Sequence, residues 1–113
     1  MKYILLTFLL LTSLAQANLG TYKNGKFIYP DTDKPYTGNI DIINEDWGKD
    51  AVEFNKDYVD GVLHGAEKVF YRSGKLKSVG YFNKGLIDGT TTLYYEDGSV
   101  QAEVNFSNGI REG

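Results

Sequence analysis

Hydrophobic and polar side chains alternate strictly along residues 99–106, which have the sequence SVQAEVNF. Val100, Ala102, Val104 and Phe106 occupy the apolar positions, and every residue between them is polar. A period of two places each set on its own face of a strand. This stretch therefore predicts a β-strand with one face toward water.

The pattern recurs at a spacing of 24 residues, because residues 61–84 align on residues 85–108 without a gap. Glycines coincide in the two copies, and aromatic residues do too, as when Phe82 aligns with Phe106. A fixed period of this size is typical of a repeat architecture. Each copy predicts a hairpin, with first strands at 66–72 and 90–96 and second strands at 75–82 and 99–106.

Glycines mark the turns of these hairpins. Ser73-Gly74 and Asp97-Gly98 are turn dipeptides, since glycine adopts a positive φ without a Cβ clash. The predicted turn glycines are Gly61, Gly65, Gly74, Gly85, Gly89, Gly98, Gly109 and Gly113.

The upstream part follows the same plan less regularly. Residues 38–60 predict an enlarged repeat with strands near 39–44 and 51–58, and residues 18–37 predict a short hairpin followed by a Pro-containing loop. That short hairpin has strands near 21–23 and 26–29, and residues 109–113 begin a further, truncated repeat. Together these segments predict an all-β fold: an elongated, single-layer antiparallel meander of about eight strands in successive hairpins.

Residues 1–17 have the features of a secretory signal peptide. Lys2 precedes a short apolar run, and Ala15-Gln16-Ala17 supplies an A-x-A cleavage pattern. The run is shorter than the roughly 18 residues that a membrane-spanning helix needs. We therefore expect cleavage after Ala17 and a periplasmic or extracellular protein; an uncleaved anchor helix is the alternative.

The stretch DGVLHGAEKVFYRSGKLKSVGYFNKGLIDGTTTLYYEDGSV, at 60–100, resembles the bacterial variant of the MORN repeat. The lead-in YKNGKFIY, at 22–29, and KPYTG, at 34–38, are similar to members of that group, including YwqK-like proteins described as antitoxins. The resemblance covers roughly residues 21–113. It implies successive hairpins in one extended sheet, and it says little about activity.

A single sheet buries little, so its aromatic side chains are the expected source of stability through cross-strand pairs. Alternation places Phe70 and Tyr94 on the face opposite Val69 and Leu93. Either these rings are purely structural, or one aromatic row is a recognition surface. Trp47, in an acidic irregular loop, either folds back over the sheet or anchors a partner.

Charge is arranged in bands along the repeats. Residues 41–60 carry a net charge of −5, residues 61–84 carry +4 and residues 85–113 carry −4. The bands either form weak cross-strand ion pairs or present Lys75 and Lys77 to an acidic partner. The whole chain is acidic, with a formal charge of −3, so we expect no binding to nucleic acid and none to membranes after cleavage.

Candidate chemistry is sparse. His64 is the only histidine, there is no cysteine, and the repeat places Asp88 and Glu112 at the position equivalent to His64, which indicates a solvated turn. The usual nucleophile–base pairs and most zinc sites are therefore excluded. We expect no catalytic residues, no cofactor and no metal site.

The sequence thus predicts an exported, non-catalytic repeat protein that acts as a protein-interaction module. The alternative is an antitoxin or immunity protein that neutralises a specific toxin by direct binding. The strand at 99–106 has one charge, Glu103, on its polar face, and it either forms an open edge that allows self-association or is protected by the tail.

Overall fold

The computed structural model of the chain describes residues 3–7, 20–29 and 32–112. Its elements are β1 (Tyr3–Thr7), β2 (Thr21–Lys23), β3 (Lys26–Ile28), β4 (Gly38–Asn44), the 3-10 turn η2 (Glu45–Trp47), β5 (Val52–Val59), β6 (Val62–Phe70), β7 (Leu76–Asn83), β8 (Leu86–Ile87), β9 (Gly89–Tyr94), β10 (Val100–Ser107) and β11 (Ile110–Arg111). In the described residues η2 is the only helical element. The all-β prediction is confirmed.

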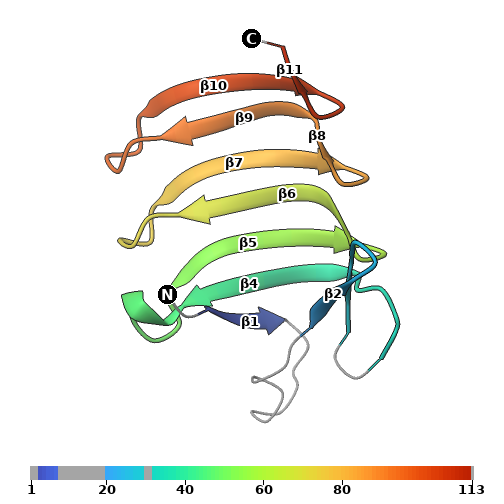
Figure 1. Ribbon diagram of the computed structural model, residues 1–113. Helices are drawn as coiled ribbons and strands as arrows, with labels where there is room; N and C mark the ends of the chain where they lie inside the picture. The colour runs from blue at the N-terminus through green and yellow to red at the C-terminus, as the bar shows by residue number, and fades with distance from the viewer. Residues whose placement is uncertain (1–2, 8–19, 30–31, 113) are drawn as a thin grey trace.

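The main sheet is an antiparallel meander of nine strands. Its order is β1-β4-β5-β6-β7-β9-β10-β11, and β8 pairs with β7 beside β9. The strands stack one above another in a single curved layer (Figure 1). Hairpins therefore follow one another along the sheet in chain order, as the 24-residue repeat predicts.

Three hairpins share the same connection to the next unit. Asp60-Gly61, Lys84-Gly85 and Asn108-Gly109 all have positive φ at both residues, as type I′ turns require. Glycine is required at Gly61 for two reasons: its φ is +78°, and a Cβ there would lie 2.7 Å from the Phe27 carbonyl oxygen. Of the predicted turn glycines, all but Gly113, which lies outside the described residues, have positive φ.

The enlarged repeat is the same hairpin with a longer tip. In the regular units the Tyr71 N–H donates to the Lys75 carbonyl, and the Tyr95 N–H donates to the Ser99 carbonyl. In the enlarged unit the Asn44 N–H donates to the Ala51 carbonyl, which places three more residues inside the turn. Those residues form η2, so β4 and β5 keep the antiparallel pairing predicted for them.

The N-terminal hairpin departs from the predicted single meander. Strands β2 and β3 form a separate two-stranded sheet, and Ile28 of β3 also forms an isolated antiparallel bridge to Pro35. The hairpin packs on the main sheet because the Phe27 ring is buried and stacks on Tyr58, with ring centroids 5.0 Å apart. Tyr36 and Ile40 complete this core. Within the described residues, the fold thus has a second layer at this corner alone.

The predicted signal segment, residues 1–17, lies mostly outside the described residues. Within it the structure describes Tyr3–Thr7, which form β1 and pair antiparallel with β4. The alternative of an uncleaved anchor helix is not tested, because most of this segment lies outside the described residues. Within the described residues, no helix has the length and apolar character needed to span a membrane.

Candidate functional site

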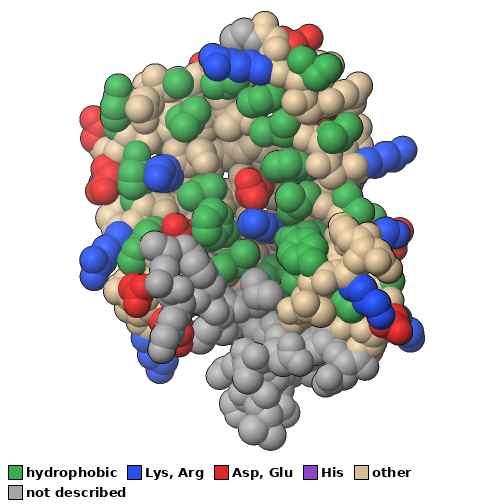
Figure 2. Space-filling model, viewed as in Figure 1, with side chains coloured by type: hydrophobic (Ala, Val, Ile, Leu, Met, Phe, Trp, Pro, Cys, Tyr) green, Lys and Arg blue, Asp and Glu red, His purple; other side chains and the backbone are tan. Residues whose placement is uncertain are grey.

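One face of the main sheet carries rows of apolar side chains that run across the strands. In the first row the pairing register aligns Ile42 with Phe54 and Phe54 with Val69, and the polar Ser78 then lies between Val69 and Leu93. A second row contains Tyr58, Leu63, Phe82 and Phe106, which lie on the same face by strand alternation. We call this surface the apolar face (Figure 2).

Most side chains of the apolar face are neither fully buried nor fully exposed. Phe54, Val69, Phe82 and Leu93 are half-buried, whereas Tyr58 is buried beneath the N-terminal hairpin. Figure 2 shows hydrophobic side chains gathered over this face with few charged groups between them. A single-layer sheet cannot cover these side chains itself, so they form a ready contact surface.

An ion pair lies between the two apolar rows. The Lys56 Nζ is 3.5 Å from the Glu67 carboxylate, and the two side chains are 22% and 25% exposed. The same ammonium lies 5.2 Å from the centre of the Phe54 ring. Lys56 and Glu67 sit opposite each other in the register, so this pair joins the acidic 41–60 band to the basic 61–84 band. The pair gives an otherwise apolar surface a polar centre.

Gly80 and Thr91 lie next to this ion pair. Gly80 is directly opposite Glu67 and is buried, and a Cβ at Gly80 would lie 2.9 Å from the Thr91 Oγ1. That hydroxyl is buried and has no hydrogen-bond partner in the described residues. The glycine therefore leaves space in the middle of the apolar face that the Thr91 side chain partly fills.

The five residues predicted as an interaction surface lie along the side of the sheet where the hairpin tips gather. Trp47 is half-buried in η2, Lys75 is exposed in the β6–β7 turn, and Lys77 is exposed on β7. Phe70 and Tyr94 end β6 and β9 at the same side. Alternation places both rings on the opposite face from Val69 and Leu93, so the five residues share a side of the sheet and do not form one patch.

Contacts within this side are local. The Lys77 Nζ lies 5.6 Å from the centre of the Tyr71 ring, and the Tyr71 hydroxyl donates to the Tyr94 carbonyl at 2.7 Å. Hydrogen bonds from Ser99 hold the pKa of Asp97 below its usual value, with a smaller contribution from the charge of Lys75. Lys75 thus faces an acidic group from the next repeat.

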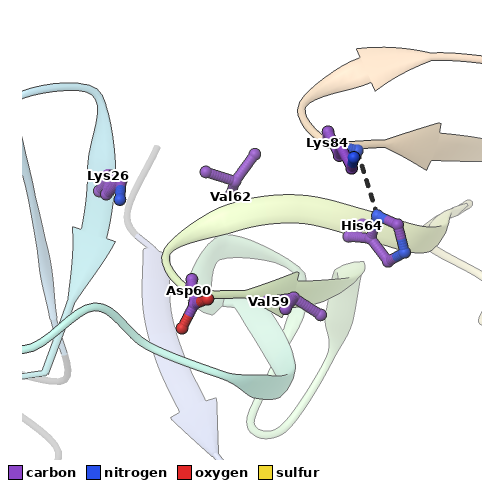
Figure 3. Close-up of a pocket in the computed structure, with 6 residues that line it drawn as sticks. All are labelled: Lys26, Val59, Asp60, Val62, His64 and Lys84. Atoms are coloured by element: carbon purple, nitrogen blue, oxygen red, sulfur yellow. Dashed lines mark hydrogen bonds between the residues drawn. The ribbon is translucent and has the colours of Figure 1, made fainter.

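A shallow pocket of about 310 Å³ lies at the opposite ends of the strands from the hairpin tips, near the type I′ turns. Its lining residues are Lys26, Val59, Asp60, Val62, His64 and Lys84. Figure 3 shows His64 turned toward the β7–β8 turn, where its Nδ1 accepts the Lys84 N–H at 3.1 Å. Asp88 accepts the Asn108 N–H in the same way, so His64 acts as a turn cap.

The described residues contain no cluster of three or more histidine, cysteine or carboxylate groups arranged for a metal ion. Buried tyrosines show the raised pKa values: burial raises the pKa of Tyr36, and burial with the Tyr22 hydrogen bond raises the pKa of Tyr58. Both residues belong to the core beneath the N-terminal hairpin. These shifts follow from packing and mark no reactive group.

The face opposite the apolar face carries a ladder of polar side chains that the sequence pattern did not predict. The Asn39 amide donates to Asn55 at 2.8 Å and to Asp57 at 2.6 Å, and the Asn55 amide donates to Asp41 at 2.6 Å. The signal was present, because polar residues occupy alternate positions of β4 and β5. Their pairing depends on the register, which the sequence pattern leaves open.

The geometry defines the chain as a β-hairpin repeat protein. Residues 63–84 and 87–108 each match the family model of the MORN repeat variant, so the chain carries two adjacent MORN repeats of this class. The two matched segments correspond to the regular 24-residue units. No curated protein and no solved structure matches the chain.

Proposed function

We propose that this MORN-repeat protein is an exported module without catalytic activity, and that it binds another protein through the apolar face of its sheet. The observation that carries the proposal is the row of half-buried side chains at Phe54, Val69 and Leu93. Among the described residues, only the N-terminal hairpin and the loop that follows it pack on this face, at one corner. A partner that covers this apolar surface removes it from water, and this burial stabilises the complex.

The ion pair at the centre of the face supports a protein partner over a lipid surface. Lys56 and Glu67 form a half-buried salt bridge that a partner would cover completely. Covering such a pair requires polar groups on the partner that satisfy its remaining hydrogen-bonding capacity. A protein surface supplies these groups at fixed positions, which makes the pair a determinant of specificity.

The test uses adjacent positions on opposite faces of β9. A photo-crosslinking amino acid at Leu93, on the apolar face, is expected to capture a partner in the producing cells. The same group at Thr92, whose side chain points to the other face, is the matched control. Equal capture at both positions, or capture at Thr92 alone, would contradict binding through the apolar face.

Export is tested separately by the mass of the protein recovered from cells. The proposal expects a chain that starts at Asn18, since cleavage is expected after Ala17. Recovery of the chain with residues 1–17 attached would contradict cleavage after Ala17 and leave the crosslinking result unaffected.

An antitoxin or immunity role is the narrower form of the same proposal. In that case the captured partner is a toxin, and the bound module suppresses its activity. Co-production of the captured protein with the wild-type chain should then restore growth, whereas co-production with a Leu93→Asp variant should not. A captured protein that is harmless on its own would exclude this role.

A further inference from the structure

The outer edge of β4 is paired in the structure by a strand from the predicted leader. β1 adds to this edge antiparallel, in a register that runs from Tyr3 opposite Asn44 to Thr7 opposite Ile40. On its other side β4 pairs with β5. All of β1 lies inside residues 1–17, which the proposed export would remove.

Removal of the leader leaves β4 unlike the first strands of the other repeats. β6 lies between β5 and β7, and β9 lies between β7 and β10. Without β1, β4 keeps β5 as its only partner strand among the described residues, and the backbone groups that pair with β1 lose their partners. Unpaired groups along an edge form a template for another strand.

The sequence of β4 contains none of the usual edge protection. Its seven residues, GNIDIIN, include no proline and no lysine. Its single charge, Asp41, already accepts a hydrogen bond from Asn55. Ile40 is buried in the corner core and Ile43 is 3% exposed, so the strand combines an open edge with apolar side chains.

Resting on the proposed export, we propose that the β4 edge of the processed protein binds an extended apolar segment of a partner protein by antiparallel strand addition. The main-chain ladder provides the affinity, and alternate side chains select the sequence. The leader, with YILLT over residues 3–7, identifies the chemistry that this edge accepts: an uncharged, mostly apolar strand of about five residues. Until cleavage, β1 of the leader occupies the β4 edge and blocks binding of another strand.

The experiment uses the full chain and a variant that opens the edge without cleavage. Leu5→Pro removes a backbone donor in the middle of β1 and should release this strand from β4. The probe is a labelled peptide with the sequence of residues 2–7 and added lysines for solubility. A peptide with proline in place of Leu5 is its matched control.

The wild-type chain should not bind the probe, because its own strand competes at high effective concentration. The Leu5→Pro chain should bind it saturably, and it should not bind the proline peptide. Amide hydrogen exchange in β4 should become about tenfold or more faster in the Leu5→Pro chain and return toward the wild-type rate with the probe. Exchange in β6, β7, β9 and β10 should stay unchanged, which shows that the fold is intact.

Protected β4 amides and no probe binding in the Leu5→Pro chain would overturn the proposal. Protection that appears only as the chain itself is concentrated would also overturn it, because a second copy would then occupy the edge. If Leu5→Pro disturbs the rest of the sheet, Leu6→Pro provides the same test at the neighbouring position. The binding test does not require export. A failure of export therefore changes only the mass of the protein recovered from cells, and a failure of strand binding changes only the peptide-binding result.

Discussion

The Tyr58 hydroxyl is hydrogen-bonded to the Tyr22 hydroxyl, and this contact joins the repeat sheet to the separate N-terminal hairpin. Tyr58 is 4% exposed, and its ring also stacks on Phe27. Burial, together with the Tyr22 hydroxyl, raises the pKa of Tyr58, and burial raises the pKa of the neighbouring Tyr36. The corner core therefore depends on two phenols that stay protonated.

Alkaline pH should loosen this core. The folded state raises both phenol pKa values, so their contribution is fully present below the ordinary phenol pKa of about 10. It is lost as pH rises above that value, because the unfolded chain releases protons that the folded chain retains. Melting temperatures measured between pH 8 and pH 11.5 should fall above about pH 10, and the fall should be smaller in Tyr58→Phe.

The control for this series is Tyr81→Phe, which removes a hydroxyl from a residue that is 48% exposed and lies outside the corner core. Its melting curve should follow the wild-type curve across the same pH range. An equal reduction of the alkaline fall in Tyr81→Phe and Tyr58→Phe would show that the effect does not arise in the core.

Gly80→Ala should destabilise the sheet through one identified clash. The new Cβ would lie 2.9 Å from the Thr91 Oγ1, and overfilling a packed position costs about 1–3 kcal/mol. Thr91→Ala removes the obstructing atom, so the cost of Gly80→Ala should fall when both changes are made together. Urea unfolding of the four proteins measures this coupling. Additive costs would contradict a direct contact.

The repeat sheet could be predicted from the sequence because each hairpin repeats the same alternation and the same turn glycines. The N-terminal hairpin could not be placed, since Tyr22 and Tyr58 are 36 positions apart and belong to no shared period. The Lys56–Glu67 pair and the Asn39–Asn55 ladder depend on the register between strands. Alternation correctly places Phe70 and Tyr94 on the face opposite Val69 and Leu93, so they form a surface separate from the apolar face.

First strands also begin earlier than predicted, since β6 starts at Val62 and the prediction begins at residue 66. The cause is the glycine that was interpreted as a turn: Gly65 has a φ of +118° but stays inside the strand opposite Phe82. In the next repeat the equivalent Gly89 begins β9 after a break at Asp88. A glycine in this position bends the strand and leaves the chain direction unchanged.

His64→Ala should weaken the β7–β8 turn, and His64→Asp should not. The His64 Nδ1 accepts the Lys84 N–H at 3.1 Å, and the Asp88 carboxylate accepts the Asn108 N–H at 3.2 Å in the equivalent place. Loss of one such hydrogen bond costs about 0.5–1.5 kcal/mol. Unfolding in urea should therefore rank His64→Asp close to the wild type and above His64→Ala.

Lys84→Asn is the matched control for that pair. This substitution keeps the backbone N–H that donates a hydrogen bond to His64, and asparagine tolerates the positive φ of 51° at this position. Its stability should equal or slightly exceed that of the wild type. Equal stabilities for His64→Ala and His64→Asp would contradict the capping role.

The tip of the enlarged repeat should be exchangeable for a regular tip. Residues 44–51 occupy the same place in the β4–β5 hairpin that residues 71–75 occupy between β6 and β7. Replacing the longer segment by the shorter one removes η2 and the buried Asn44, whose side chain caps η2 through the Asp46 N–H. Because loop-closure entropy changes little with a difference of three residues, the melting temperature should shift by no more than about 8 °C.

The tip from residues 95–99 is a second donor for the same exchange, and it should give the same result if the repeats are interchangeable. Amide exchange should show β4 and β5 still protected in both exchanged proteins, because their pairing register does not include the tip. Loss of protection in β4 with both donors would show instead that η2 and Asn44 are required to hold β4 against β5. The extra three residues would then be a structural part of the enlarged repeat.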